Sequence, residues 1–99
     1  MNLIFHPIAE KELDEAAAWY NDKEQGLGAA LIFEVDQAIS RIINLPNAWP
    51  ILNGTLRRCR TRRFPYYVVY EKDGSDLTII AIMHERRRPG YLEGRKKSN

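Results

Sequence analysis

Hydrophobic residues recur at helical spacing in two stretches of the first half of the chain. The first stretch follows Pro7, a residue that suits the first turn of a helix because its missing N–H is not needed there. Its apolar positions are Ala9, Leu13, Ala16, Ala17 and Tyr20. The second stretch runs from about Gly28 to Leu45 and is ended by Pro46; its apolar positions are Leu31, Val35, Ala38, Ile39, Ile42 and Leu45. The pattern therefore predicts two amphipathic helices joined by a short link that contains glycine, an α-helical hairpin.

Shorter stretches rich in β-forming residues precede and follow this hairpin. A first strand is predicted over residues 2–6, and three more over residues 56–64, 66–72 and 77–84, the last two joined by a turn at residues 73–76. Residues 46–54 contain two prolines and an Asn-Gly pair, which predict a loop, and we expect Trp49 to anchor it. The resulting fold class is α+β: the helical hairpin covers one face of an antiparallel sheet of about four strands, and the other face presents arginines.

The composition limits what kind of protein this is. A chain of 99 residues with 44% hydrophobic content predicts one globular domain over residues 1–99, with a basic tail over about residues 86–99. The N-terminus lacks the basic and apolar segments of a signal peptide, and no stretch approaches the roughly 20 apolar residues that cross a bilayer. The single cysteine, Cys59, has no disulfide partner. We therefore expect a cytoplasmic protein with no membrane partner.

The net charge of +2 conceals an uneven distribution. Residues 1–54 contain three basic and eight acidic residues, a charge of −5, whereas residues 55–99 contain twelve basic and five acidic residues, a charge of +7. This split indicates a cationic surface built from the second half of the chain. The expected partners are anionic: nucleic acid or an acidic protein segment.

Five arginines lie close together in the predicted strand over residues 56–64. Because side chains alternate along a strand, Arg58, Arg60 and Arg62 are expected on one face, about 6.6 Å apart from one to the next. Guanidinium groups suit bidentate contacts with phosphate or carboxylate groups, so this face is a candidate binding surface. The alternative is a solvated strand face that pairs in part with Glu71 or Glu85.

A second cluster follows the last predicted strand and comprises His84, Arg86, Arg87, Arg88 and Tyr91. A histidine can exchange a proton near neutral pH, arginines can stabilise charge that develops on a phosphate, and a tyrosine can stack on a base or donate a proton. The alternatives are an ordinary histidine at a strand end and a tyrosine that packs. Because the sequence has no Cys/His cluster and no phosphate-binding glycine motif, we expect no metal and no cofactor.

Several of these segments resemble the RelE/ParE toxin family in their order and spacing. The resemblance covers nearly the whole chain and is most specific in two blocks. The first is Arg63-Phe64-Pro65-Tyr66 followed by Val68-Val69-Tyr70, and the second is Ile79-Ile80-Ala81-Ile82-Met83-His84 followed by Arg86, Arg87 and Arg88. The resemblance implies a toxin that is silenced by a cognate antitoxin protein, whose C-terminal segment wraps the toxin.

The two branches of this family imply different targets. RelE-like members cleave mRNA, usually on the ribosome, without a metal, and the residues here that would carry that activity are His84, Tyr91, Arg58, Arg60 and Arg86. ParE-like members inhibit DNA gyrase. In either branch, contacts with the target or the antitoxin are expected from Arg57, Arg58, Arg60, Arg62, Arg86, Arg87 and Arg88.

Two positions and one run favour the ParE branch. Tyr67 stands where RelE-like enzymes typically have an arginine, Glu85 lies near where they have another basic residue, and the run from Ala81 to Arg86 looks more like ParE. We therefore expect a ParE-like toxin that inhibits DNA gyrase. Two alternatives stay open: a RelE-like mRNA endoribonuclease, and a basic nucleic-acid-binding module with no toxic role.

Overall fold

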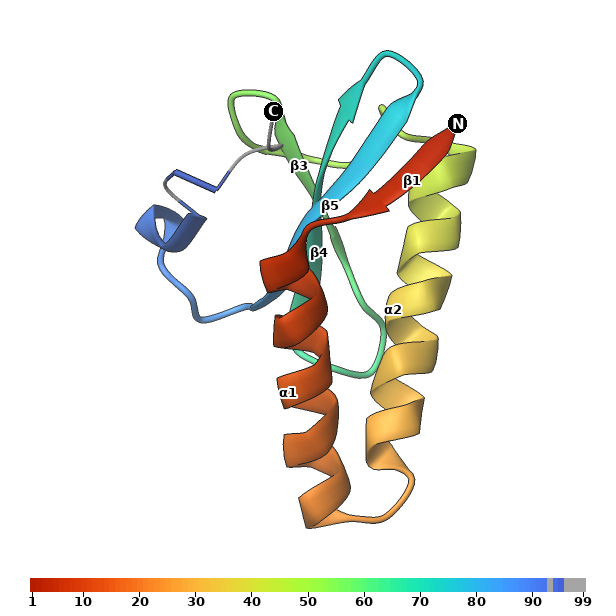
Figure 1. Ribbon diagram of the computed structural model, residues 1–99, viewed down its shortest axis with the longest axis vertical. Coiled ribbons are helices and arrows are strands. Elements are labelled where there is room, and N and C mark those ends of the chain that lie inside the picture. The colour runs from red at the N-terminus through yellow and green to blue at the C-terminus, as the bar shows by residue number, and fades with distance from the viewer. Residues whose placement is uncertain (93, 96–99) are drawn as a thin grey trace.

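The computed structural model describes residues 1–92 and 94–95 (Figure 1). The order of elements is β1 (Asn2–Phe5), α1 (Pro7–Lys23), α2 (Leu27–Asn44), β2 (Ile51–Asn53), β3 (Leu56–Arg60), β4 (Tyr66–Asp73), β5 (Asp76–His84) and a short 3₁₀ helix, η1 (Pro89–Leu92). The α1–α2 hairpin lies against one side of the sheet, and the segment that contains η1 lies beside the sheet near the start of α1 (Figure 1). The predicted α+β class and the helical hairpin are confirmed.

The sheet has the strand order β1-β5-β4-β3-β2. β1 pairs with β5 in parallel, and every other neighbouring pair is antiparallel. The prediction of an antiparallel sheet was therefore wrong, because the β1–β5 pair makes the sheet mixed. The strand count of five is one more than the four strands that the sequence indicated. The missed strand, β2, has only three residues and follows Pro50, so its sequence alone is typical of a loop and only its pairing with β3 makes it a strand.

The ends of the two helices follow from local chemistry. His6 caps α1, because its Nδ1 accepts a hydrogen bond from the N–H of Ile8 at 3.0 Å. Gly26 precedes α2 with φ of +94°, in the left-handed region that favours glycine. At Gly28 the two helices touch: a Cβ added there would lie 2.5 Å from the carbonyl oxygen of Ala17. The hairpin therefore depends on a residue without a side chain at this crossing.

The main core lies between the hairpin and the sheet. It contains the predicted apolar positions of α2 except Leu45, and it is completed by sheet residues that include Tyr70, Leu77, Ile79 and Ile82. Leu45 was also predicted on this face but is 62% exposed, because α2 ends at Asn44 and Leu45 is no longer helical. The prediction that Trp49 anchors the following loop is confirmed by its Nε1, which donates to the carbonyl oxygen of Arg41 at 3.4 Å.

The sequence had suggested that the opposite face of the sheet presents arginines, but this face is not only basic. It carries a second apolar cluster, to which no described residue of α1 or α2 belongs: Leu56, Val69, Ile80, Ala81, Met83 and Leu92. A β-bulge contributes to it, since Tyr70 pairs with Ile79 and Val69 with Ala81, which leaves Ile80 as an extra residue in β5. Leu92 shows that part of the predicted basic tail folds back onto the sheet. Residues 96–99 of that predicted tail lie outside the described residues.

Candidate functional site

β3 carries two of the predicted arginines on the face away from the helices. Arg58 and Arg60 alternate with Cys59, which is buried in the core under the hairpin. The Arg58 guanidinium lies 4.3 Å from the centre of the Tyr67 ring, and Arg60 forms an ion pair with Glu85 at 3.0 Å. The predicted face is therefore formed by Arg58 and Arg60.

Two other arginines of this stretch, Arg57 and Arg62, are not part of this strand face. Arg57 donates to the carbonyl oxygen of Trp49 at 2.7 Å and so holds the loop that follows α2. Arg62 is not in the strand at all, because β3 ends at Arg60. The Thr61 hydroxyl, which lies 2.8 Å from the carbonyl oxygen of Phe64 and 3.1 Å from that of Tyr66, turns the chain into a tight loop instead.

This loop, residues 61–65, holds Arg62 and Arg63 at the surface. Arg63 has φ of +74°, in the left-handed region that side chains other than glycine rarely adopt. Such a conformation persists where the surrounding contacts impose it, and the Thr61 hydroxyl supplies those contacts here. The two guanidinium groups are therefore presented by a loop of fixed shape.

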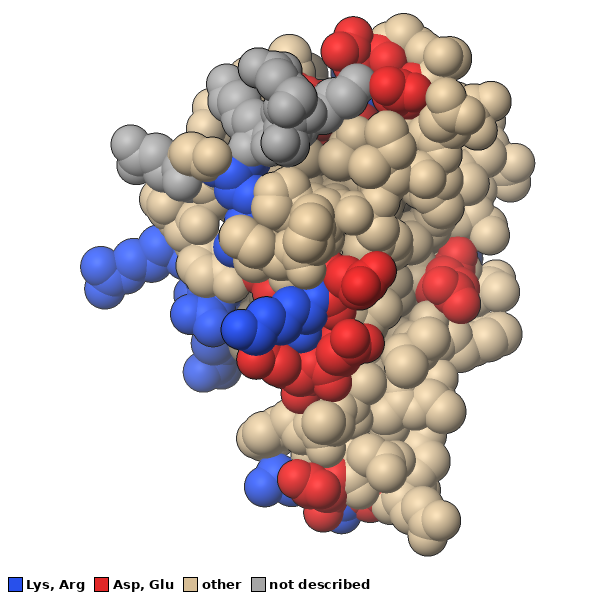
Figure 2. Space-filling model, in the orientation of Figure 1, with Lys and Arg blue, Asp and Glu red and all other residues tan. Residues whose placement is uncertain are grey.

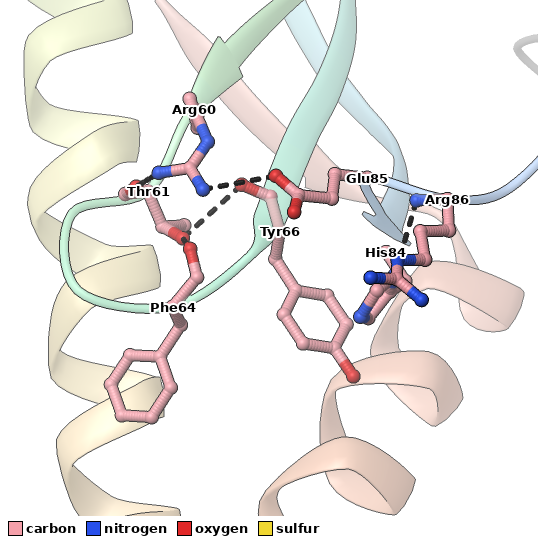
Figure 3. Close-up of polar contacts among 7 residues, drawn as sticks. All are labelled: Arg60, Thr61, Phe64, Tyr66, His84, Glu85 and Arg86. Carbon is pink, nitrogen blue, oxygen red and sulfur yellow. Dashed lines mark hydrogen bonds and ion pairs between the residues drawn. The ribbon is translucent and has the colours of Figure 1, made fainter.

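A second turn, residues 84–88, lies beside the first. His84 Nδ1 accepts a hydrogen bond from the N–H of Arg86 at 3.1 Å, and Glu85 N–H donates to the carbonyl oxygen of Pro65 at 2.9 Å. Figure 3 shows the Arg60–Glu85 ion pair spanning the same junction. A pocket of about 470 Å³ opens on this turn and is lined by Arg86, Arg87, Arg88, Gly90 and Tyr91.

Together these elements form what we call the arginine face: Arg58, Arg60, Arg62, Arg63, Arg86, Arg87 and Arg88. Within residues 1–92 and 94–95, Arg60 is the one member of this set in an ion pair. The other guanidinium groups have no described carboxylate partner, so the surface is strongly cationic.

The structure does not bring all five predicted ribonuclease residues together. His84 pairs with Tyr66 across the β4–β5 ladder and packs edge-on against its ring at 5.2 Å. Tyr66 packs against the core under the hairpin, and Figure 3 shows its ring pointing away from the Arg60–Glu85 pair. Arg58 instead stacks on Tyr67, the next residue of the strand and hence on the opposite face. The sheet therefore separates His84 from Arg58 and Arg60.

Tyr91 is held by Glu12, a residue that the sequence analysis did not select for the site. The Glu12 carboxylate accepts hydrogen bonds from the Tyr91 hydroxyl, from Arg95 at 2.9 Å and from the backbone N–H of Ile82 at 3.0 Å. Since β1 ends at Phe5, opposite Ile79, no strand reaches Ile82 on that edge of β5, and Glu12 supplies the missing acceptor. The only sequence signal was an acidic residue bordering the buried stripe of α1.

The Glu12–Arg95 ion pair is well shielded from solvent, with both side chains 11% exposed. Burial acts to lower the pKa of Arg95. The hydrogen bonds and charges of Glu12 and Tyr91 outweigh burial, so the pKa of Arg95 is raised. Beside this cluster, a pocket of about 210 Å³ is lined by Glu12, Glu15, Ala16, Tyr66, Ile82, His84, Arg87 and Tyr91. The C-terminal segment is thus attached to α1 by a buried polar cluster.

Two further titratable groups near the site have a pKa raised by burial. Burial raises the pKa of the Tyr66 phenol, the neighbouring Tyr20 adds to this, and Arg87 opposes it. Burial likewise raises the pKa of the Cys59 thiol, although Arg41 and Arg62 lie close enough to oppose the shift. Both groups therefore stay protonated near neutral pH. Among the described residues there is no group of three metal-ligating side chains, and no helix is long and apolar enough to cross a membrane.

Comparison with known proteins gives consistent results. The family model described as ParE toxin of the type II toxin–antitoxin system parDE matches residues 3–89. Toxin ParE2 from two strains of Mycobacterium tuberculosis is 30% identical over 92 residues, which covers 92% of this chain and 88% of the relative.

A solved structure shows the same fold. The chain from the chromosomal ParDE TA system of P. aeruginosa has a TM-score of 0.75 and 15% sequence identity, and the match covers 85% of this chain and 95% of that one. The family model and the relatives together favour the ParE branch that the sequence predicted over the RelE branch. The protein therefore belongs to the ParE toxin family of type II toxin–antitoxin systems.

Proposed function

We propose that this chain is a toxin that inhibits DNA gyrase in the cytoplasm and is neutralised by a cognate antitoxin. Family membership supports the toxin role. The observation that favours gyrase over mRNA is the separation of His84 from Arg58 and Arg60 by the sheet. Inhibition by surface binding requires no single proton-transfer residue, whereas RNA cleavage does.

The alternative, a metal-independent ribonuclease, needs its groups around one phosphodiester. An acid and a base must reach the attacking and leaving oxygens, and cationic groups must stabilise the charge that develops between them. Here the Tyr91 hydroxyl donates to Glu12, and the His84 Nδ1 accepts the N–H of Arg86. The Tyr91 hydroxyl is thus engaged in holding the C-terminal segment in place, which counts against Tyr91 as the proton-transfer group.

The target is tested by asking which synthesis stops first after induced expression in a bacterial host. We expect DNA synthesis to fall before protein synthesis, and the purified chain to inhibit supercoiling by gyrase. His84→Ala, if folded, should retain toxicity. An early and selective collapse of protein synthesis with cut mRNA, abolished by His84→Ala, would instead establish the ribonuclease.

The antitoxin is proposed to cover the arginine face with an acidic segment. The charge of this surface supports the proposal, since complementary charge steers association and fixes the register of a complex. Co-expression of the neighbouring reading frame should restore growth. The double variant Arg58→Glu, Arg60→Glu should weaken the complex and make its salt dependence shallower, and unchanged affinity would show that the antitoxin binds elsewhere.

A further inference from the structure

The exposed apolar residues and the arginine face occupy different parts of the molecule. Among the described residues, every large hydrophobic side chain that is exposed lies at or before position 51: Met1, Leu3, Ile4, Ile8, Trp19, Ile32, Phe33, Ile43, Leu45 and Ile51. The arginine face begins at Arg58 and contains none of them. Protein interfaces commonly combine arginines with aromatic anchors near their centre. The arginine face lacks such anchors in the described part of the chain, so its contacts depend on charge rather than on apolar packing.

The aromatic rings near this face support the arginines and leave little ring surface free. Arg58 covers Tyr67 at 4.3 Å, Arg87 covers Tyr91 at 4.6 Å, and Arg63 lies 5.4 Å from the centre of the Phe64 ring. Single-stranded nucleic acids are usually held by bases stacked on exposed rings. Rings already covered by guanidinium groups are unsuited to that role, which favours contacts with a backbone over contacts with bases.

Arginine predominates in the two segments that form this surface. Residues 57–70 and 84–92 contain eight arginines and one acidic residue, Glu85. Glu85 pairs with Arg60 at the surface, where such an ion pair is weak and readily exchanged. In Figure 2, basic side chains project from the left of the molecule beside the C-terminal segment, while few appear over α2. A dense array of free guanidinium groups is what phosphate neutralisation requires.

From these observations we infer that the arginine face binds the phosphate backbone of duplex DNA, without sequence preference. A second step rests on the proposed function: while it inhibits gyrase, the toxin contacts both the gyrase protein and the DNA that gyrase holds. The two arginine-bearing turns are linked by the Glu85–Pro65 hydrogen bond, so they meet the backbone as one preformed surface. The apolar surface of the first half of the chain lies apart from the arginine face and is open to a protein while DNA is bound. DNA and the acidic segment of the antitoxin would compete for the arginine face.

The first test measures binding of the full chain to a short fluorescent DNA duplex over a range of salt concentrations. Each phosphate contact contributes about −0.9 to the slope of log K against log salt. The double variant Arg86→Gln, Arg88→Gln should therefore make the slope shallower by about 1.8. Affinity should fall about tenfold or more at fixed salt, since each lost contact is a charge-assisted hydrogen bond.

The matched control removes the same charge from other surfaces. Lys11→Gln with Lys72→Gln also lowers the net charge by two, but Lys11 lies on α1 and Lys72 on the β4–β5 hairpin. This control should keep the slope of the wild-type chain. Equal losses in both double variants would overturn the inference, because binding would then depend only on net charge. Tighter binding of single-stranded RNA, or of polyglutamate, than of duplex DNA would overturn it too.

A supercoiling assay with purified gyrase separates this inference from the proposed function. Loss of both DNA binding and gyrase inhibition in Arg86→Gln, Arg88→Gln supports both steps. If this variant no longer binds DNA but still inhibits gyrase, the proposed function stays intact and the inference is overturned. DNA binding by the wild-type chain, without inhibition of gyrase, supports the arginine face as a DNA site and overturns the proposed function.

Discussion

The first and second halves of this chain differ in net charge and in their exposed apolar residues. The first half, residues 1–54, carries a charge of −5 and all of the exposed large apolar residues described, whereas the second half carries a charge of +7 and the arginine face. Charged residues are spread along α1, whereas α2 contains few of them and is nearly neutral. The comparison indicates two surfaces for two kinds of partner, one apolar and one anionic.

The halves are nevertheless joined by buried polar contacts, and these differ from the contacts within the arginine face. Glu12 of α1 binds Tyr91 and Arg95 of the C-terminal segment, and the Tyr70 hydroxyl of β4 donates to the Pro46 carbonyl after α2. Within the arginine face the one described ion pair, Arg60–Glu85, has side chains 49% and 38% exposed. Stability should therefore depend on the contacts between the halves and little on those within the arginine face.

The largest effect is expected from Glu12→Ala. The change leaves the Arg95 guanidinium without its carboxylate and the Ile82 N–H without its acceptor, and breaking a buried ion pair typically costs about 3–5 kcal/mol. Urea unfolding should show this loss, and hydrogen exchange should speed up in residues 82–92. Asp14→Ala, an exposed acidic residue on the same helix, is the control. Equal midpoints for the two variants would show that Glu12 does not join the halves.

The second effect is a loss of stability at alkaline pH that depends on Tyr70. Burial raises its pKa to about 12, with Arg57 opposing and Cys59 adding to the shift. A tyrosine whose folded-state pKa lies above its unfolded value of about 10 stabilises the fold fully below pH 10, and that contribution is lost between pH 10 and 12. Two units correspond to at most about 2.7 kcal/mol. Urea unfolding at pH 9 and pH 11.5 measures it, and Tyr70→Phe should flatten the difference.

A third effect is confined to the first half. Gly28→Ala places a Cβ 2.5 Å from the Ala17 carbonyl oxygen, so α1 and α2 must move apart, and overpacking of this kind typically costs about 1–3 kcal/mol. Thermal unfolding gives the loss. Gly90→Ala, where a Cβ meets nothing within 4 Å, should be close to neutral. If both changes behave alike, the close helix contact contributes nothing to stability.

The smallest effect is expected inside the arginine face. Arg60→Gln removes the exposed ion pair with Glu85, and surface pairs contribute only about 0–1 kcal/mol. The unfolding midpoint should scarcely change, although binding of an anionic partner should weaken. A loss as large as that of Glu12→Ala would remove the distinction between the two sets of contacts.

Much of the fold was predictable because its signals are local. Pro7 and Pro46 bound the helical region, the apolar stripes identify the buried faces, and the hairpin turn follows from Asp73-Gly74. The blocks around Arg63 and His84 predicted the RelE/ParE family. Tyr67, Glu85 and the run from Ala81 to Arg86 favoured its ParE branch, which the comparisons confirmed. The parallel pairing of β1 with β5 was not predictable, because no residue of either strand encodes the direction of its neighbour.

What the sequence determined about this protein, then, is its helical hairpin, its uneven charge and its family. The tertiary structure decided which arginines share a surface: strand alternation placed Arg62 beside Arg60, but the Thr61 hydroxyl ends the strand first. It also decided that His84 and Arg58 lie on opposite faces, and that Glu12 rather than a second-half residue receives Tyr91. The turn at Thr61 depends on where its hydroxyl folds back within five residues. The other two outcomes depend on contacts between residues far apart in the chain, which spacing along the sequence cannot specify.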